Sequence, residues 1–386
     1  MAELSLLAES AGSIPAASVI ARKGKTDPAL FIGSGKANEV KRVMEEQGAE
    51  LAIFNHPLSP TQQRNLERQL GFHVMDRTGL ILDIFSQRAQ SHIGKTQVEL
   101  AQVRYQMSRL VRAWSHLERQ RGGIGVRGGP GETQMELDRR ILATKAKRLE
   151  NELEKLQRQQ RTQRRARNRK DVFSVSLVGY TNAGKSTLFN SLTKAGTYAA
   201  DQLFATLDTT SRKMHLEGLG SIVVSDTVGF IRELPHQLVE AFRATLDETI
   251  HADLILHVID ACSPVAREQQ SEVEAVLREI GADDIPRIEI MNKIDQMPQT
   301  FLNGAQLRGA NGIPSQVFLS AKTGLGLDLL RSALAECSQM TDRIRVEHNR
   351  AKKQLAPNEF LSPLPERPES SEFNSIPNRS YTPNDA

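Results

Sequence analysis

A phosphate-binding loop motif constrains the fold of this chain more than any other feature. The motif reads Gly179-Tyr180-Thr181-Asn182-Ala183-Gly184-Lys185-Ser186 and directly follows an apolar, β-branched run from Val172 to Val178. The spacing G-x-x-x-x-G-K-[ST] after a buried strand predicts a tight turn into a helix whose N-terminal N–H groups bind phosphate. We expect Lys185 to reach the β- and γ-phosphates and Ser186 to bind Mg²⁺. The alternative is an ordinary glycine-rich turn between a strand and a helix.

Three further motifs follow, each at the end of an apolar run: Asp226-Thr227-Val228-Gly229, Asn292-Lys293-Ile294-Asp295 and Ser320-Ala321-Lys322. We expect Asp226 to hold the magnesium shell through water and the Gly229 N–H to meet the γ-phosphate. Asp295 can accept two hydrogen bonds from guanine N1–H and the 2-amine, a donor pair that adenine lacks. The Ser320 motif would offer a backbone N–H to the guanine oxygen. In this order the four motifs predict a GTPase that binds GTP and GDP.

The segment between the first two motifs must supply a second magnesium ligand. From the residues alone, Thr206, Thr209 and Thr210 are equal candidates. Phe230 follows Gly229, where Ras-like enzymes carry a glutamine that orients the attacking water, so we predict slow intrinsic hydrolysis completed by another group. Asn182 stands where several potassium-activated GTPases carry an asparagine, which suggests the hypothesis that K⁺ binds near the phosphates.

Length and composition limit the other possibilities. With 386 residues of which 39% are hydrophobic, the chain can form two to three domains. Two cysteines, Cys262 and Cys337, indicate neither a disulfide framework nor a metal site. The first residues are too acidic for a signal peptide, and no apolar run approaches the ~18 residues of a membrane helix. We expect a cytoplasmic monomer without a membrane segment.

The first 92 residues are predicted to form a small α/β domain. Strands are expected at residues 17–21, 51–54 and 72–75, and helices at 37–47 and 60–70. Gly33-Ser34-Gly35-Lys36 lacks the four-residue spacer of a phosphate loop, so it is interpreted as a turn that opens a helix.

Residues 93–170 are predicted to form a long helical hairpin. Its helices are expected at 96–121 and 133–169, joined by a glycine-rich loop from Gly122 to Glu132. The loop is either a flexible turn or a probe whose bare backbone fits against RNA. Basic residues indicate a polyanionic partner, although a solvated helix would show the same charges. The RNA-binding candidates are Arg119, Arg121, Arg127, Arg139 and Arg140; Trp114 could stack on a base or lie in the core.

Residues 171–340 are predicted to form the GTP-binding (G) domain, and residues 341–386 a disordered polar tail. The expected fold class is α/β: a Ras-like G domain with a six-stranded, mostly parallel sheet, preceded by the small α/β domain and the hairpin.

Long motifs outside the G domain resemble the HflX family of GTPases. They lie at residues 76–85, 97–102, 116–120, 127–134 and 138–140, and residues 178–190 resemble the family too. The resemblance, over about residues 15–340, implies a cytoplasmic GTPase that binds the large (50S) ribosomal subunit and its rRNA. It also implies that the glycine-rich loop points toward the peptidyl transferase centre and that the protein splits stalled or idle ribosomes.

The resemblance further implies that Thr206 is the second magnesium ligand, and the family lacks the catalytic glutamine. Many members carry a proline where this chain has Thr209, and a folded domain after the G domain. A GTPase of rRNA maturation or ribosome assembly, and a nucleotide sensor without enzymatic activity, remain as alternatives.

The expected site residues follow from these motifs. Catalytic roles are expected for Lys185, Thr206 and Gly229, and magnesium binding for Ser186, Thr206 and, through water, Asp226. Nucleotide contacts are expected from Gly179, Tyr180, Thr181, Asn182, Ala183, Gly184, Lys185, Ser186, Thr187, Phe204, Ala205, Thr206, Leu207, Asp208, Asp226, Thr227, Val228, Gly229, Asn292, Lys293, Ile294, Asp295, Ser320, Ala321 and Lys322.

Overall fold

The computed structural model describes residues 2–21, 26–110, 134–168, 172–194, 203–216, 220–232, 243–297, 305–309 and 312–354. The chain divides into a unit of residues 1–341 and a unit of residues 342–386. None of the helices in these ranges is both long and apolar enough to span a membrane.

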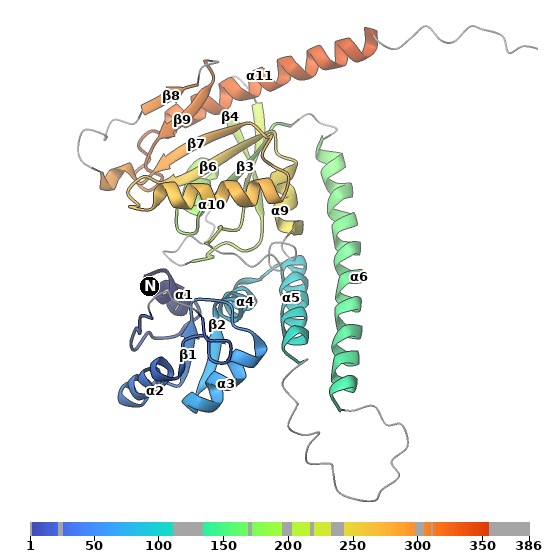
Figure 1. Ribbon diagram of the computed structural model, residues 1–386. Coiled ribbons are helices and arrows are strands. Elements are labelled where there is room, and N and C mark those ends of the chain that lie inside the picture. The colour runs from blue at the N-terminus through green and yellow to red at the C-terminus, as the bar shows by residue number, and fades with distance from the viewer. Residues whose placement is uncertain are drawn as a thin grey trace, which may run out of the picture. The chain divides into compact units, whose positions relative to one another are not determined.

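The N-terminal part of the chain is a small α/β unit around two parallel strands (Figure 1). Its elements are α1 (Ala2–Ser10), α2 (Ser34–Gln47), β1 (Leu51–Phe54), α3 (Pro60–Leu70), β2 (His73–Asp76) and α4 (Arg77–Arg88). Helix α3 begins sharply because Ser59 and Gln62 exchange hydrogen bonds in a capping box, with Pro60 in the first turn. Leu66 and Leu70 of α3 pack with Val74 of β2 in the core of this unit.

One expected strand of this unit is absent, and one of its helices was not predicted. Residues 17–21 form no strand, and Ile20 is 70% exposed, so its apolar side chain packs against no sheet. Helix α4 was not predicted because it starts directly at the end of β2, where the Asp76 carboxylate accepts a hydrogen bond from the Gly79 N–H (2.8 Å) and caps it. The turn at Gly33 is confirmed: its φ is 74° and α2 begins at the next residue.

The hairpin consists of α5 (His92–Leu110) and α6 (Gln134–Asn168), which pack side by side (Figure 1). Leu100 and Val103 of α5 pack on Ala146 and Leu149 of α6. Ion pairs Glu99–Lys145 (2.8 Å) and Arg104–Glu150 (2.9 Å) lie along the same contact. The predicted loop and Trp114 lie outside the described residues.

The G domain is built on a seven-stranded sheet in the order β4-β5-β3-β6-β7-β9-β8. The strands are β3 (Ser174–Gly179), β4 (Thr210–Leu216), β5 (Gly220–Asp226), β6 (Leu254–Asp260), β7 (Arg287–Asn292), β8 (Ala305–Arg308) and β9 (Pro314–Phe318). The two edge strands β4 and β8 are antiparallel to their neighbours, and the others run parallel. The prediction of six strands missed β8, a short edge strand whose sequence AQLR has no buried side chain.

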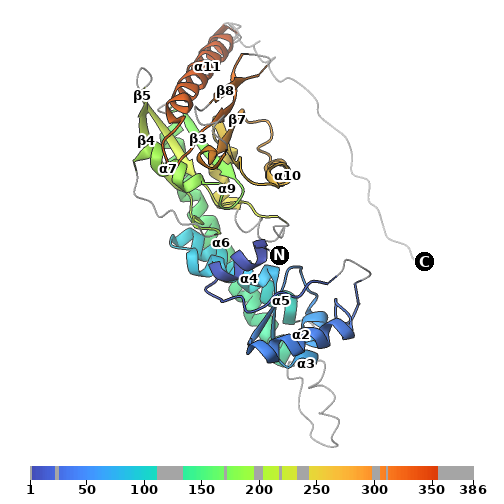
Figure 2. The same cartoon turned by 90° about the vertical axis from the view of Figure 1, so that its left-hand side faces the viewer.

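Helices cover both faces of this sheet (Figure 2). They are α7 (Lys185–Thr193), α9 (Arg243–Ile250), α10 (Ala266–Glu279) and α11 (Leu327–Gln354). Leu188 of α7 and Leu330 of α11 pack with Leu177 of β3 on one face. Val273 of α10 packs with Val178 of β3 on the other. Successive residues of β3 therefore face opposite layers, as in a parallel strand buried on both sides. Helix α11 continues past the predicted domain end at residue 340.

One apolar cluster joins the G domain to the elements before it. Phe204 and Phe230, from the loops after the first and second nucleotide motifs, share this cluster with Leu7 of α1, Phe85 of α4 and Val98 of α5. The rings of Phe85 and Phe204 meet edge to face with centroids 4.7 Å apart. The two loops that sense the nucleotide in this fold are thus packed against the N-terminal unit and the hairpin.

Candidate nucleotide-binding site

The phosphate loop takes its shape from two glycines and from pairing with the loop after β5. Gly179 has φ 153°, and a Cβ there would lie 2.2 Å from the Val258 carbonyl oxygen. Gly184 has φ 94° and precedes the first residue of α7. The Phe230 N–H donates to the Gly179 carbonyl (3.1 Å), and the Thr181 N–H donates to the Phe230 carbonyl (2.7 Å). Backbone contacts therefore hold the first two motifs together, at a place where larger side chains would not fit.

Lys185 is buried under this loop. Its ammonium donates to the carbonyl oxygens of Gly179 (3.0 Å) and Tyr180 (2.8 Å). Burial lowers the pKa of Lys185 to about 8, although the nearby Asp226 carboxylate favours the charged form. A phosphate group within reach would replace these carbonyls as a stronger partner for the ammonium.

Three oxygens converge beside Lys185. The Ser186 hydroxyl lies 2.7 Å from the Thr206 hydroxyl and 2.7 Å from Oδ2 of Asp226, and Thr206 donates to the same Oδ2 at 3.1 Å. Burial raises the pKa of Asp226, opposed first by the charge of Lys185. Of the three candidate threonines, Thr206 brings its hydroxyl into this cluster, while Thr210 begins β4.

This oxygen cluster fits a magnesium ion. Oδ1 of Asp226 is buried and has no hydrogen-bond partner among the described residues, so a water of a metal shell could satisfy it. Hydroxyl and carboxylate oxygens are the donors that Mg²⁺ prefers, and Mg²⁺ commonly keeps several of its waters. The described residues contain no group of three or more His, Cys, Asp or Glu side chains that could hold a metal by themselves. The proposed ligand set instead combines two hydroxyls with one carboxylate.

The second motif places the Gly229 backbone next to Lys185, and the Phe230 side chain that follows it points into the apolar cluster. A Cβ on Gly229 would lie 3.0 Å from the Lys185 ammonium, so the Gly229 backbone borders the space beside that charge. Phe230 is 1% exposed and packs in the apolar cluster with α4 and α5. Its side chain therefore cannot orient a water, as expected from the sequence.

Asn292 ties the base-binding end to the phosphate loop. Its Nδ2 donates to the Ala183 carbonyl (2.9 Å), and its Oδ1 accepts from the Ala321 N–H (2.9 Å). Lys293 has φ 66° and pairs with Asp260 at 2.8 Å. Asp295 lies in a short 3-10 helix, η2 (Ile294–Gln296), directly after β7. One buried amide thus connects three of the four motifs.

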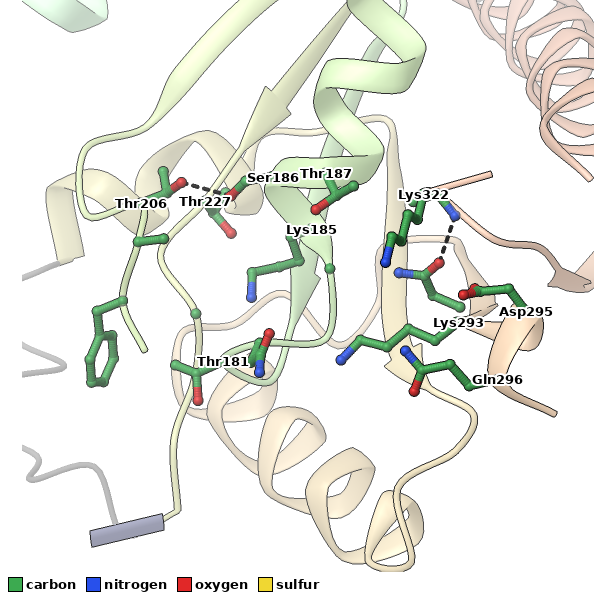
Figure 3. A pocket seen from close by; sticks show the side chains of 17 residues that line it. Thr181, Lys185, Ser186, Thr187, Thr206, Thr227, Lys293, Asp295, Gln296 and Lys322 are labelled. Carbon is green, nitrogen blue, oxygen red and sulfur yellow. Dashed lines mark hydrogen bonds between the residues drawn. The ribbon is translucent and has the colours of Figure 1, made fainter. Parts of the chain in front are cut away.

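These elements surround a cavity of about 350 Å³, within the range of small-molecule sites (Figure 3). It is lined by Thr181, Asn182, Gly184, Lys185, Ser186, Thr187, Phe204, Ala205, Thr206, Thr227, Gly229, Asn292, Lys293, Asp295, Gln296, Ala321 and Lys322. Gln296 was not predicted because it follows the third motif and reaches the cavity only through the η2 turn. The remaining predicted contacts lie in the same elements but do not line it: Gly179, Tyr180, Ala183, Leu207, Asp208, Asp226, Val228, Ile294 and Ser320.

The predicted RNA-binding residues lie elsewhere. Arg139 and Arg140 are exposed on α6. Arg119, Arg121 and Arg127 lie outside the described residues, so their assignment stays a prediction.

Comparison with known proteins agrees with this geometry. Residues 1–86 match the family described as GTP-binding GTPase N-terminal, residues 88–167 its Middle Region, and residues 174–293 the 50S ribosome-binding GTPase family. The chain is 52% identical over 335 residues to the GTPase HflX of Escherichia coli K12, covering 86% of this chain and 78% of the relative. The chain belongs to the HflX family of GTPases. It is therefore an enzyme, a GTP hydrolase with a phosphate loop.

Other HflX relatives match over a similar span. The GTPase HflX of Magnetococcus marinus is 48% identical over 332 residues, which is 86% of this chain and 76% of the relative. Among solved structures, a GTP-binding protein from Sulfolobus solfataricus in complex with GDP is 24% identical with a TM-score of 0.46, covering 88% of this chain and 96% of that chain.

The low pKa of Lys185 predicts that nucleotide affinity weakens in alkaline solution. Without nucleotide the side chain loses its proton as pH rises through about 8, and binding a polyphosphate then requires uptake of that proton. GDP affinity should fall about tenfold between pH 7 and pH 9, as measured by fluorescence titration with a labelled GDP. Lys185→Arg stays charged over this range and should show a flatter profile. Identical pH profiles of the two proteins would contradict this assignment.

Proposed function

We propose that GTP binds in the 350 Å³ cavity with its phosphates at the start of α7 and its guanine beside η2. Lys185 would neutralise the β- and γ-phosphates, and the Gly229 N–H would donate to the γ-phosphate. Ser186 and Thr206 would bind Mg²⁺ directly and Asp226 through water; Mg²⁺ supplies charge neutralisation of the phosphates when bound. Asp295 would select guanine. The support for this proposal is the convergence of all four motifs on one cavity.

The same arrangement accounts for a slow intrinsic rate. The Phe230 side chain is buried away from the cavity, so none of its atoms can align the attacking water. Asn182 lines the cavity with φ 60°, and we propose it as a ligand through which K⁺ could act near the phosphates. A partner that completes the site could raise kcat by about 10³ to 10⁵.

We further propose that this GTPase binds the large ribosomal subunit and its rRNA, and acts in ribosome splitting or rescue and so in the control of protein synthesis. The observation that carries this proposal is the match of residues 174–293 to the 50S ribosome-binding GTPase family. The exposed Arg139 and Arg140 on α6 are suited to phosphate contacts. GTP would hold the loops around Thr206 and Gly229, hydrolysis would release them, and subunit affinity would follow.

Turnover with and without purified large subunits tests the ribosomal role. Subunits should accelerate GTP hydrolysis by the full chain, and replacing residues 122–131 by a short Gly-Ser linker should remove most of this acceleration. The intrinsic rate should be unchanged, because the described residues that line the cavity all belong to the G domain. Arg42→Ala, an exposed arginine on α2, is the control for loss of a positive charge elsewhere.

Two outcomes would contradict the proposal. Equal acceleration of the intact and shortened proteins would remove the role of the loop. Acceleration by naked rRNA precursors but not by finished subunits would instead favour the alternative, a GTPase of rRNA maturation or ribosome assembly.

A further inference from the structure

Asp208 does not line the nucleotide cavity but makes a contact outside it. Its Oδ2 accepts hydrogen bonds from the backbone N–H groups of Gln90 (2.8 Å) and Ser91 (2.7 Å), and its Oδ1 accepts from the Ser91 hydroxyl (2.5 Å). Ser91 is the residue immediately before α5, the first helix of the hairpin. A carboxylate from the G domain therefore occupies the N-terminal end of a hairpin helix, where the backbone N–H groups favour a negative charge.

The end of α5 is shaped to receive this carboxylate. The Ser91 hydroxyl accepts a hydrogen bond from the Gly94 N–H (2.9 Å), so Asp208 holds the residue that caps the helix. A Cβ on Gly94 would lie 2.1 Å from Oδ1 of Asp208, so a larger residue in the first turn would displace the carboxylate. Gly94, which has no side chain, thus leaves the space that the Asp208 carboxylate occupies.

The segment from Thr206 to Asp208 also contacts the magnesium side of the cavity, through Thr206. Thr206 lies two residues before Asp208, and its hydroxyl contacts Ser186 and Asp226. Two residues span at most about 7 Å, so Thr206 cannot move far while Asp208 stays bound to α5. The Leu203 N–H donates to the Ser10 hydroxyl of α1 (3.1 Å), so the segment is also held before Thr206.

We propose that Asp208 is a positioning residue for GTP hydrolysis, which acts by fixing Thr206 through the first turn of α5. In this arrangement the hairpin completes the nucleotide site of its own chain. The contact of Asp208 with the first turn of α5 also makes α5 sensitive to whether Thr206 is bound at the magnesium side of the cavity. The inference rests on the role proposed above for Thr206, and it adds a residue, Asp208, and a receptor for it, the turn formed by Gln90, Ser91 and Gly94.

Substitutions on both sides of the contact test this inference. Asp208→Ala should lower the single-turnover rate of hydrolysis about ten- to a hundredfold, because small displacements of positioning groups have effects of this size. Affinity for GDP should change less than threefold, since GDP does not need the threonine. Asp208→Asn should recover most of the rate, because its amide oxygen can still accept from Gln90 and Ser91.

Gly94→Ala provides the same test without altering the G domain. It should reproduce the effect of Asp208→Ala, and the double variant should be no slower than either single one. Gly35→Ala is the matched control: Gly35 also lies in the first turn of a helix, but a Cβ there would contact nothing within 4 Å. The rate of this control should equal that of the unmodified protein.

Hydrogen exchange distinguishes a positioning role of Asp208 from a general loss of stability. The N–H groups of Gln90 and Ser91 should exchange more slowly with a non-hydrolysable GTP analogue than with GDP, and Asp208→Ala should abolish this difference. Thr206→Ala separates the possible failures. If Thr206→Ala leaves the rate intact, the proposed role of Thr206 is wrong; if it slows hydrolysis while Asp208→Ala and Gly94→Ala do not, this inference alone is wrong.

Discussion

Asp295→Asn should change the base preference of this GTPase from guanine to xanthine. The carboxylate is expected to accept hydrogen bonds from N1–H and the 2-amine of guanine, each worth about 1.5–3 kcal/mol with a charged partner. Their loss should lower GTP affinity by about 10² to 10⁴. Xanthine carries a carbonyl at C2, to which the new amide can donate, so affinity for xanthosine triphosphate should rise. Competition titrations with both nucleotides measure the change.

The control for this substitution is Asp284→Asn, which removes the same charge from an exposed position before β7. It should leave both affinities unchanged. Equal GTP affinity of Asp295→Asn and the unmodified protein would contradict the assignment of Asp295 as the base-selecting residue. It would also remove the reason for placing guanine beside η2.

Lys185→Ala should abolish most hydrolysis while the fold persists. The ammonium is buried against the phosphate loop, and removing one such transition-state contact costs about 10² to 10³ in kcat. Because the ground-state interaction is also lost, nucleotide affinity should fall by about 10- to 100-fold. Thermal stability should not fall sharply, because the substitution also removes a charge that is costly to bury. Single-turnover hydrolysis and thermal unfolding measure the two effects separately.

Lys194→Ala is the matched control, since Lys194 is the exposed C-cap of the same helix, α7. Its kinetics should be those of the unmodified protein. A Lys185→Ala variant that hydrolyses GTP within tenfold of the normal rate would show that another group carries the phosphate charge.

The nucleotide motifs were predictable because each one is local. A strand, a glycine turn and a helix follow one another at Gly179 to Lys185, and the same few residues determine both the backbone path and the chemistry. The helix expected at residues 60–70 is likewise present as α3 (Pro60–Leu70). By contrast, residues 17–21 have the composition of a strand but pair with no other described strand. Strand β8 pairs with β9, although its residues do not have the composition of a strand.

The choice of Thr206 among three threonines needed more than local pattern. From the residues alone the three were equal, and the family resemblance favoured one of them. In the folded chain, the apolar side chains of Phe204 and Leu207 are buried against α4 and α5, which leaves the Thr206 hydroxyl facing Ser186 and Asp226. Packing of the neighbouring residues therefore orients this threonine.

Four spaced motifs in the amino-acid order already specify a guanine-nucleotide hydrolase, because phosphate and base recognition depend on short segments whose conformation is encoded within them. The contact of Asp208 with Ser91 joins residues 117 positions apart, and neither residue carries a pattern that points to the other. Such a contact exists because apolar burial brings the loop after α7 onto α1, α4 and α5. Folding of the whole first unit, and no local pattern, thus connects the nucleotide site to the hairpin.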